Sequence, residues 1–243
     1  VEELRVARAA YWEELLPDPE PQGDRAARLR IAARHAWTRH NFFQACGSWL
    51  AQDQPPATHA DRLMLAECLA DGRDPRAPQY AGLLAAEQPI ETDLALATWL
   101  ANSGRAPEAG ERMLAALAAY RTDPWVYRPL VRRTLPVAVR LALEDRALAP
   151  RLYQAFSQPF AVDMFQQPRL HSRIGISRAL DAQSLCLDVI SPLEPHVPWE
   201  EPFLTYRYQC YQAHHHPLAA RARRDLETFL EDAPPKLAEG LGQ

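Results

Sequence analysis

The stretch Asp93–Pro124, DLALATWLANSGRAPEAGERMLAALAAYRTDP, predicts two short helices joined by a turn at Gly104. Leucines and Trp99 recur with helical spacing in its first part, and the alanines between them favour a helix. Thr92 is placed to cap the start of this helix, and Gly104 suits the left-handed turn that commonly ends one. Pro107 fits the first turn of the second helix, where its missing N–H has no cost.

The same pattern occurs twice upstream with a period of about 32 residues, which is the signature of a helical-repeat protein. A helix pair this short cannot bury its apolar faces alone, so stacked neighbours are expected. Turn residues recur at Gly104, Gly72 and His40, and small residues recur at Ala109, Ala77 and Ala45.

The motif Gly104-Arg105-x-x-Glu108-Ala109 resembles the turn of a tetratricopeptide (TPR) repeat. Flanking apolar and small residues have the matching spacing: Leu96, Ala97 and Leu100 before it, Met113 and Ala116 after it. Pro89 stands where this family ends its second helix. The resemblance implies an all-α fold, a TPR-like solenoid (superhelix) of antiparallel helix hairpins, over residues 25–124.

The rest of the chain divides around these repeats. Residues 1–24 predict an N-terminal helix and a linker, and residues 125–243 predict an irregular helical continuation that ends in a helical hairpin. Two helices are expected at 125–133 and 135–144, separated near Pro136. The aromatic segment 158–168 predicts a short helix or turn packed against the core.

The TPR resemblance implies that the first helix of each pair lines a concave groove. Arginines one helical turn apart beside a tryptophan would suit an acidic or C-terminal peptide. The groove positions are Arg30, Arg34, Trp37, Arg62, Thr98 and Asn102.

Composition argues against several classes of function. A net charge of −4 and a pI near 6.1 disfavour a nucleic-acid binder, including RNA binding by helical repeats. No apolar run has the length of a membrane span, so direct membrane insertion is not expected. Lys236 is the only lysine among many arginines, which suggests a GC-rich bacterial genome. With no signal-peptide pattern, a cytoplasmic location is expected, although the start at Val1 suggests a module of a larger chain.

Cysteines and histidines offer the only hints of site chemistry. The cysteines form no CxxC, so buried reduced thiols are expected, with disulfides or metal ligands as the alternatives. His214-His215-His216 is interpreted as a solvated loop, with a metal-binding pair of Cys210 and His214 as the alternative. No metal site and no cofactor are therefore expected. The four cysteines are Cys46, Cys68, Cys186 and Cys210.

Large and charged side chains are assigned to structural roles. The tryptophans Trp37, Trp49, Trp99 and Trp125 suggest packing anchors. Arginine groups predict solvated faces, and these are Arg132-Arg133 and Arg221-Arg223-Arg224.

No catalytic motif accompanies these residues: HExxH, GxSxG, GxGxxG and the P-loop are all absent. The sequence therefore predicts a non-enzymatic scaffold that binds a protein or peptide partner. The alternative is an enzyme or small-ligand sensor with a pocket around residues 158–178, where aromatic and arginine side chains gather.

Overall fold

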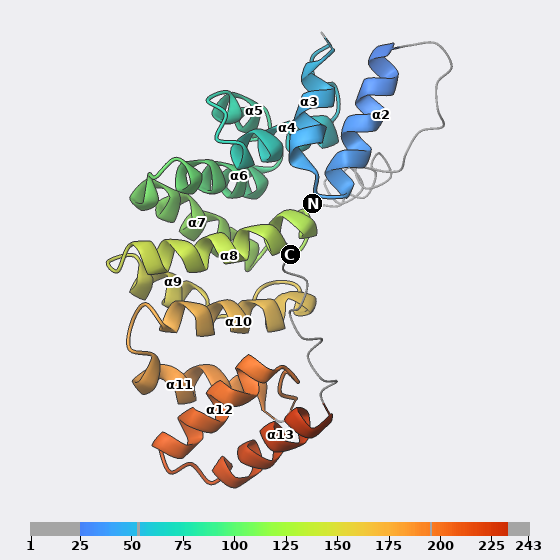
Figure 1. Ribbon diagram of the computed structural model, residues 1–243. Helices are drawn as coiled ribbons and strands as arrows, with labels where there is room; N and C mark the ends of the chain where they lie inside the picture. Colours follow the sequence, from blue (N-terminus) through green and yellow to red (C-terminus); the bar gives the residue numbers. More distant parts are fainter. Residues whose placement is uncertain (1–24, 53, 195, 233–243) are drawn as a thin grey trace, which may run out of the picture.

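The computed structural model describes residues 25–52, 54–194 and 196–232. The helix and linker predicted within residues 1–24, and the tail from residue 233 onward, lie outside the described residues. The described part contains twelve α-helices, two short 3-10 helices and no strand, which confirms the all-α fold class. Figure 1 shows the helices following one another through the molecule in chain order.

The helices begin and end as follows. They are α2 (Arg25–Thr38), α3 (Phe42–Leu50), α4 (His59–Asp71), α5 (Ala77–Gly82), α6 (Pro89–Asn102), α7 (Ala106–Tyr120), α8 (Arg128–Glu144), α9 (Ala149–Ala155), η1 (Asp163–Phe165), α10 (Gln166–Ser177), α11 (Ala182–Ile190), η2 (Ser191–Leu193), α12 (Glu201–Ala213) and α13 (Ala219–Asp232).

Helices that are neighbours in sequence pack in pairs, most extensively α2 with α3, α4 with α5, α6 with α7 and α12 with α13. The first helix of each pair also contacts the first helix of the next, along the series α2, α4, α6, α8 and α10. Figure 1 shows the pairs of the first half side by side, with α8 below α6 and above α10. These contacts bury the apolar side that a single pair would leave exposed.

Local sequence signals set the ends of several helices. Asn41 caps α3 by accepting from the Gln44 N–H. Thr58 and Asp61 form a reciprocal capping box at the start of α4, as the spacing Thr-x-x-Asp favours. Asp181 accepts from two backbone N–H groups at the start of α11.

A single type of turn ends α2, α4, α6 and α12. Each contains one residue with positive φ, and the next residue donates its N–H to a carbonyl in the last turn of the helix, as in a Schellman motif. The left-handed residues are His40 (φ 60°), Arg73 (φ 58°), Gly104 (φ 76°) and His215 (φ 50°). The bonds run from Asn41 to Ala36, from Asp74 to Leu69, from Arg105 to Leu100 and from His216 to Tyr211.

The alignment of Gly72 with Gly104 is wrong by one position. Helix α4 extends to Asp71, so Gly72 is its C-cap residue with φ −74°, and the left-handed position falls on Arg73. The chain therefore uses a non-glycine residue at two of the three turns that the repeat pattern placed at His40, Gly72 and Gly104.

Substitutions at these turns are expected to have opposite effects. A left-handed backbone costs an L-residue roughly 1–2 kcal/mol, which glycine avoids at some entropic cost. Arg73→Gly should therefore raise the free energy of unfolding by about 0.5–1 kcal/mol, and Gly104→Ala should lower it by about 1 kcal/mol. Urea denaturation measures both. A less stable Arg73→Gly variant would contradict this account of the turn.

Two helix boundaries predicted at prolines differ in the structure. Helix α6 begins at Pro89, which fits a first turn, so the proline does not end the preceding helix. Thr92 consequently lies inside α6, and its buried hydroxyl donates to the Gln88 carbonyl (2.9 Å) in place of capping the helix. Pro136 lies within the single helix α8, where two helices were expected. Packing of α8 against α6, α7, α9 and α10 offsets the roughly 3 kcal/mol that an interior proline costs.

The aromatic segment before α10 behaves as predicted. It contains the 3-10 helix η1, and both Phe160 and Phe165 are buried. Their rings lie 5.0 and 5.9 Å from the Tyr120 ring, centroid to centroid. Trp37 and Trp49 are buried as anchors, but Trp125 is 39% exposed and does not serve as one.

The expectation of reduced thiols is wrong, because the structure pairs all four cysteines. Cys46 on α3 bonds to Cys68 on α4, and Cys186 on α11 bonds to Cys210 on α12. In each pair the Cα atoms lie 5.9 Å apart, although the cysteines are 22 and 24 residues apart in sequence. Closing a loop of this length stabilises a fold by about 3 kcal/mol in the chain-entropy model.

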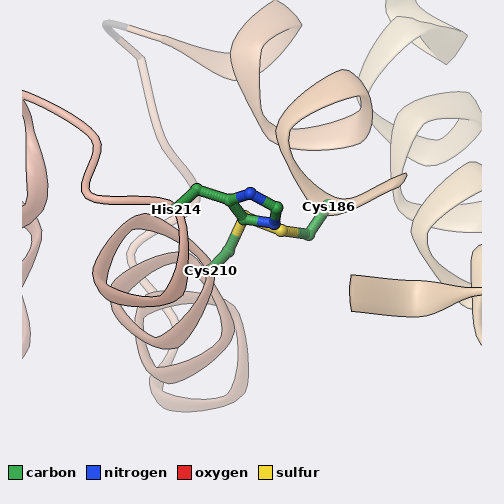
Figure 2. Close-up of side chains that lie close together, drawn as sticks. All are labelled: Cys186, Cys210 and His214. Atoms are coloured by element: carbon green, nitrogen blue, oxygen red, sulfur yellow. A yellow bond between two sulfur atoms is a disulfide. The ribbon is translucent and has the colours of Figure 1, made fainter. Parts of the chain in front are cut away.

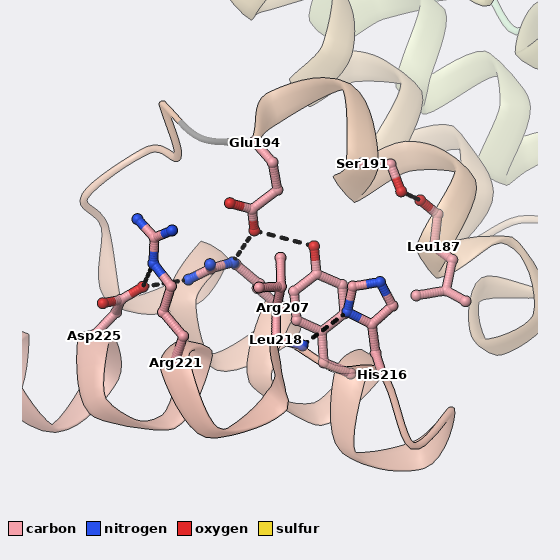
Figure 3. Close-up of polar contacts among 9 residues, drawn as sticks. Leu187, Ser191, Glu194, Arg207, His216, Leu218, Arg221 and Asp225 are labelled. Carbon is pink, nitrogen blue, oxygen red and sulfur yellow. Dashed lines mark hydrogen bonds and ion pairs between the residues drawn. The ribbon is translucent and has the colours of Figure 1, made fainter.

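A buried arginine organises the C-terminal part of the chain (Figure 3). The side chain of Arg207 is fully buried, and it donates to Glu194 Oε1 and Asp225 Oδ2, both at 2.6 Å. The Tyr211 hydroxyl donates to the same Glu194 oxygen at 3.0 Å. This network joins α12 to α13 and to the segment that follows η2, over a second apolar core.

Candidate functional site

The candidate functional site is a cleft of about 140 Å³ where the first helices of successive pairs meet, here called the central cleft. Its walls come mainly from α4, α6 and α8, three helices that contact one another in that order. The lining residues are Phe42, Glu67, Ala70, Asp71, Ala95, Thr98, Asn102, Leu130, Arg133, Thr134, Val137 and Arg140.

A buried polar network forms the floor of the central cleft. Glu67 of α4 accepts the Trp37 indole N–H at 2.6 Å and the Arg133 Nε–H at 2.5 Å. Arg133 also donates from Nη1 to His40 Nδ1 at 2.9 Å. The Trp37 ring stacks on Tyr127, with 5.2 Å between the ring centroids. The network thereby ties α2, α4 and α8 together beneath the cleft.

Burial dominates the electrostatics of this floor. It raises the pKa of Glu67, while the positive charge of Arg133 and the hydrogen bond from Trp37 oppose that shift. Burial and the nearby Glu67 raise the pKa of Tyr127 to about 12, so its phenol stays neutral at physiological pH. The floor therefore joins the Glu67 carboxyl group to the Arg133 guanidinium, in surroundings that disfavour an isolated charge.

The rim of the central cleft has an accessible cation. Arg140 is 45% exposed, and its Nη2 donates to Asn102 Oδ1 at 2.7 Å. Glu144 lies 3.8 Å from its Nε, a weak contact between two exposed groups. The hydroxyl of Thr98 donates to the Leu94 carbonyl at 3.0 Å, so it offers an acceptor to the cleft. A carboxylate entering here would meet a positioned guanidinium beside polar and apolar walls.

A second cleft of about 610 Å³, the N-terminal cleft, lies between α2 and α4. Arg30 and Arg34 line it together with Trp49 and Asp61. Arg34 is mostly buried and is held by Asp61 through two contacts of 3.1 Å, so its charge is already compensated. Arg30 contacts the side chain of Gln54 at the opposite wall.

The structure distributes the six predicted groove residues over different places. Thr98 and Asn102 line the central cleft, whereas Arg30 and Arg34 line the N-terminal cleft. Trp37 is buried beneath the central cleft and cannot touch a ligand directly. Arg62 is half-buried and is not among the lining residues of either cleft.

Sequence reasoning missed the other five polar residues that line the central cleft: Glu67, Asp71, Arg133, Thr134 and Arg140. Arg133 was assigned with Arg132 to a solvated face, but only Arg132 is exposed. The signal available was the spacing of Arg133 and Arg140, seven positions apart on α8, which places both on one helix face. Nothing in the sequence marked Glu67 of α4 as the partner of Arg133.

Comparisons with protein-family models, with curated proteins and with solved structures find no match to this chain. Within the described residues, no helix is both long enough and apolar enough to cross a membrane.

Proposed function

We propose that this chain is a TPR-like helical-repeat scaffold that binds a protein or peptide partner, without catalytic activity of its own. In this proposal the helix pairs stack as a solenoid, and the central cleft receives an acidic side chain or a C-terminal carboxylate of the partner. The observation that carries the proposal is the recurrence of one turn geometry at His40, Arg73 and Gly104, each at the end of a first helix.

Recurrent turns support a repeat because each turn sets the angle between the two helices of its pair. Equal reversals make successive pairs stack in a similar way, which leaves their first helices side by side. The contacts of α2 with α4, of α4 with α6 and of α6 with α8 agree with that stacking. A row of first helices offers the extended surface that repeat scaffolds use for binding.

The polar groups of the central cleft support a peptide ligand with an acidic group. Arg140 is both exposed and held in position by Asn102, so less side-chain entropy is lost on binding. Ala95, Leu130 and Val137 add apolar wall to the same cleft. A hydrogen bond to a charged group typically contributes about 1.5–3 kcal/mol, and the apolar wall adds shape selectivity.

Pull-down from native lysate followed by mass spectrometry tests this proposal. Arg140→Ala should weaken capture of a specific partner about tenfold or more, because it removes one charged hydrogen bond. Arg132→Ala is the matched control, since Arg132 is an exposed arginine of the same helix that does not line the cleft. Arg30→Ala reports on the N-terminal cleft, whereas Arg34→Ala would also disturb the Asp61 pair.

A partner that is captured equally by wild type, Arg140→Ala and Arg30→Ala would contradict binding through either cleft. A partner lost only with Arg30→Ala would move the binding site to the N-terminal cleft. Loss of capture with Arg132→Ala would show that the effect is one of general surface charge and would also count against the proposal.

The alternative of an enzyme or sensor pocket at residues 158–178 retains a cleft of about 140 Å³, which His171 and Arg178 line together with Glu200. The aromatic side chains that suggested it, Phe160 and Phe165, are packed in the core. Arg169 is buried as well, and its guanidinium donates to the Gln166 side chain (2.8 Å) and to the Phe156 carbonyl. These groups are occupied in holding η1 and α10 on the core, so they do not converge on a ligand.

The disulfides bear on the compartment in which the chain acts. Structural disulfides persist in oxidising compartments and are rare in cytosolic proteins. We therefore propose that the disulfide-bonded form works in an oxidising compartment. The cytoplasmic location expected from the sequence would require the reduced form of both cysteine pairs.

A further inference from the structure

The Cys186–Cys210 disulfide has a histidine beside it (Figure 2). A ring nitrogen of His214 and the two sulfur atoms all lie within 4.8 Å of one another. Among the described residues, this is the one group of three or more His, Cys, Asp or Glu side chains whose ligand atoms all lie within 4.8 Å of one another. Cys46 and Cys68 form the other disulfide, and they belong to no such group in the described part of the chain.

The positions of the three residues on α11 and α12 bring their side chains together. Cys210 and His214 are four positions apart, so both lie on one face at the C-terminal end of α12. Helix α11 contacts α12 and presents Cys186 to that face. The ring of His214 is exposed but oriented, because its Nε2 lies 2.9 Å from the Gln183 carbonyl, a hydrogen-bond distance.

A cleft of about 350 Å³ opens beside the two cysteine residues. Both cysteines contribute to its wall, although each is buried as a residue. Reductant and metal ion therefore have an approach from this side, and a fourth ligand such as water has room. The remaining lining residues are Gln183, Tyr206, Gln209 and Ala213.

We propose that Cys186, Cys210 and His214 form a binding site for a divalent cation of the zinc class when their disulfide is reduced. Two thiolates and one imidazole are a known ligand set for zinc, which leaves a fourth tetrahedral position open. Thiolate ligands also select against the hard cations magnesium and calcium. The disulfide and the metal-bound site are mutually exclusive states of the same two sulfur atoms.

The conversion between the states balances as follows. A dithiol reductant gives up two electrons and two protons and becomes a disulfide, while the Cys186–Cys210 bond breaks to give two thiols. Metal binding then releases the two thiol protons to solvent and forms two metal–sulfur bonds and one metal–nitrogen bond. No further electron transfer is needed, because zinc is not redox-active.

Cobalt substitution tests the site in the full chain. The protein is reduced with a phosphine, which becomes a phosphine oxide as water supplies its oxygen and the thiol protons, and Co²⁺ is added without oxygen. We expect one Co²⁺ per chain, with thiolate-to-cobalt charge-transfer bands and the visible bands of a tetrahedral site. Zinc should abolish these bands by displacement, and the oxidised protein should not develop them.

Variants identify the ligands. His214→Ala should lower the affinity for Co²⁺ by roughly 10- to 100-fold or more. Loss of an outer-shell partner of a metal ligand already costs about that much, and His214 would be a ligand itself. His215→Asn is the matched control, because asparagine tolerates the left-handed conformation of that neighbouring exposed residue. Cys46→Ser/Cys68→Ser should keep the bands, whereas Cys186→Ser/Cys210→Ser should lose them.

Alkylation followed by mass spectrometry uses the wild-type protein, so its result does not depend on whether a variant folds. Zinc should slow the alkylation of Cys186 and Cys210 in reduced wild-type protein and leave the rates at Cys46 and Cys68 unchanged. Absence of cobalt bands in the reduced wild type would overturn the proposal. Equal zinc protection of all four cysteines, or unchanged affinity in His214→Ala, would overturn it too.

Discussion

Arg207→Met is expected to lower the free energy of unfolding by about 3 kcal/mol, measured by guanidinium denaturation with the disulfides intact. The arginine is fully buried, and it donates to Glu194 and Asp225 at 2.6 Å each. Removing it leaves two carboxylates without their shared cation, and one oxygen of Glu194 is already buried without a hydrogen bond. Partial exposure of both carboxylates keeps the loss near the lower end of the range for broken buried pairs.

Arg221→Ala is the control for Arg207→Met. Arg221 is 50% exposed and lies 3.9 Å from the same Asp225 oxygen, so it contacts one of the same carboxylates from the solvent side. Exposed pairs of this kind contribute about 0–1 kcal/mol. Equal losses in the two variants would show that burial does not determine the strength of this network, and would contradict the account given for Arg207.

Glu67→Ala is expected to lower the free energy of unfolding by about 3–4 kcal/mol. The substitution leaves the Arg133 guanidinium and the Trp37 indole N–H without their shared acceptor beneath the central cleft. It also leaves a cavity beside α4, because the Glu67 side chain is buried. Thermal and chemical denaturation of the variant measure the loss.

Asp71→Asn is the matched control, because Asp71 lies one turn further along α4 at the exposed edge of the same cleft. Its substitution should change the stability by no more than about 0.5 kcal/mol. Glu67→Gln should give an intermediate loss, since the amide still accepts a hydrogen bond but carries no charge. A Glu67→Ala variant as stable as Asp71→Asn would contradict the role of Glu67 as the centre of the floor network.

Much of the helical layout could be predicted from the sequence, because its signals act within one or two turns of the chain. Thr58 and Asp61 are three residues apart, and the capping box they predict is present. Gly104 and its turn follow equally from local rules. The left-handed residue was predicted at Gly72 but lies at Arg73, because α4 continues to Asp71. Local sequence signals do not fix the last residue of a helix to a single position.

The candidate sites were less predictable, since their residues converge from different helices. Thr98 and Asn102 were predicted as groove residues from their register in the TPR-like sequence pattern, and the structure places both in the lining of the central cleft. Arg133 and Glu67, 66 positions apart, were not linked, because no local pattern records a partner at that separation. Trp37 was placed in the groove by register alone, yet stacking on Tyr127 puts it beneath the surface.

The sequence by itself determined the all-α class, the positions of most helices and the turns between them, because capping, periodicity and proline placement are short-range effects. The tertiary structure alone decided which cysteines pair, whether Pro136 breaks α8 and which charges are buried. Each of these depends on the free energy of packing distant helices, which outweighs local preference: Cys186 meets Cys210 and His214 only because α11 lies against α12.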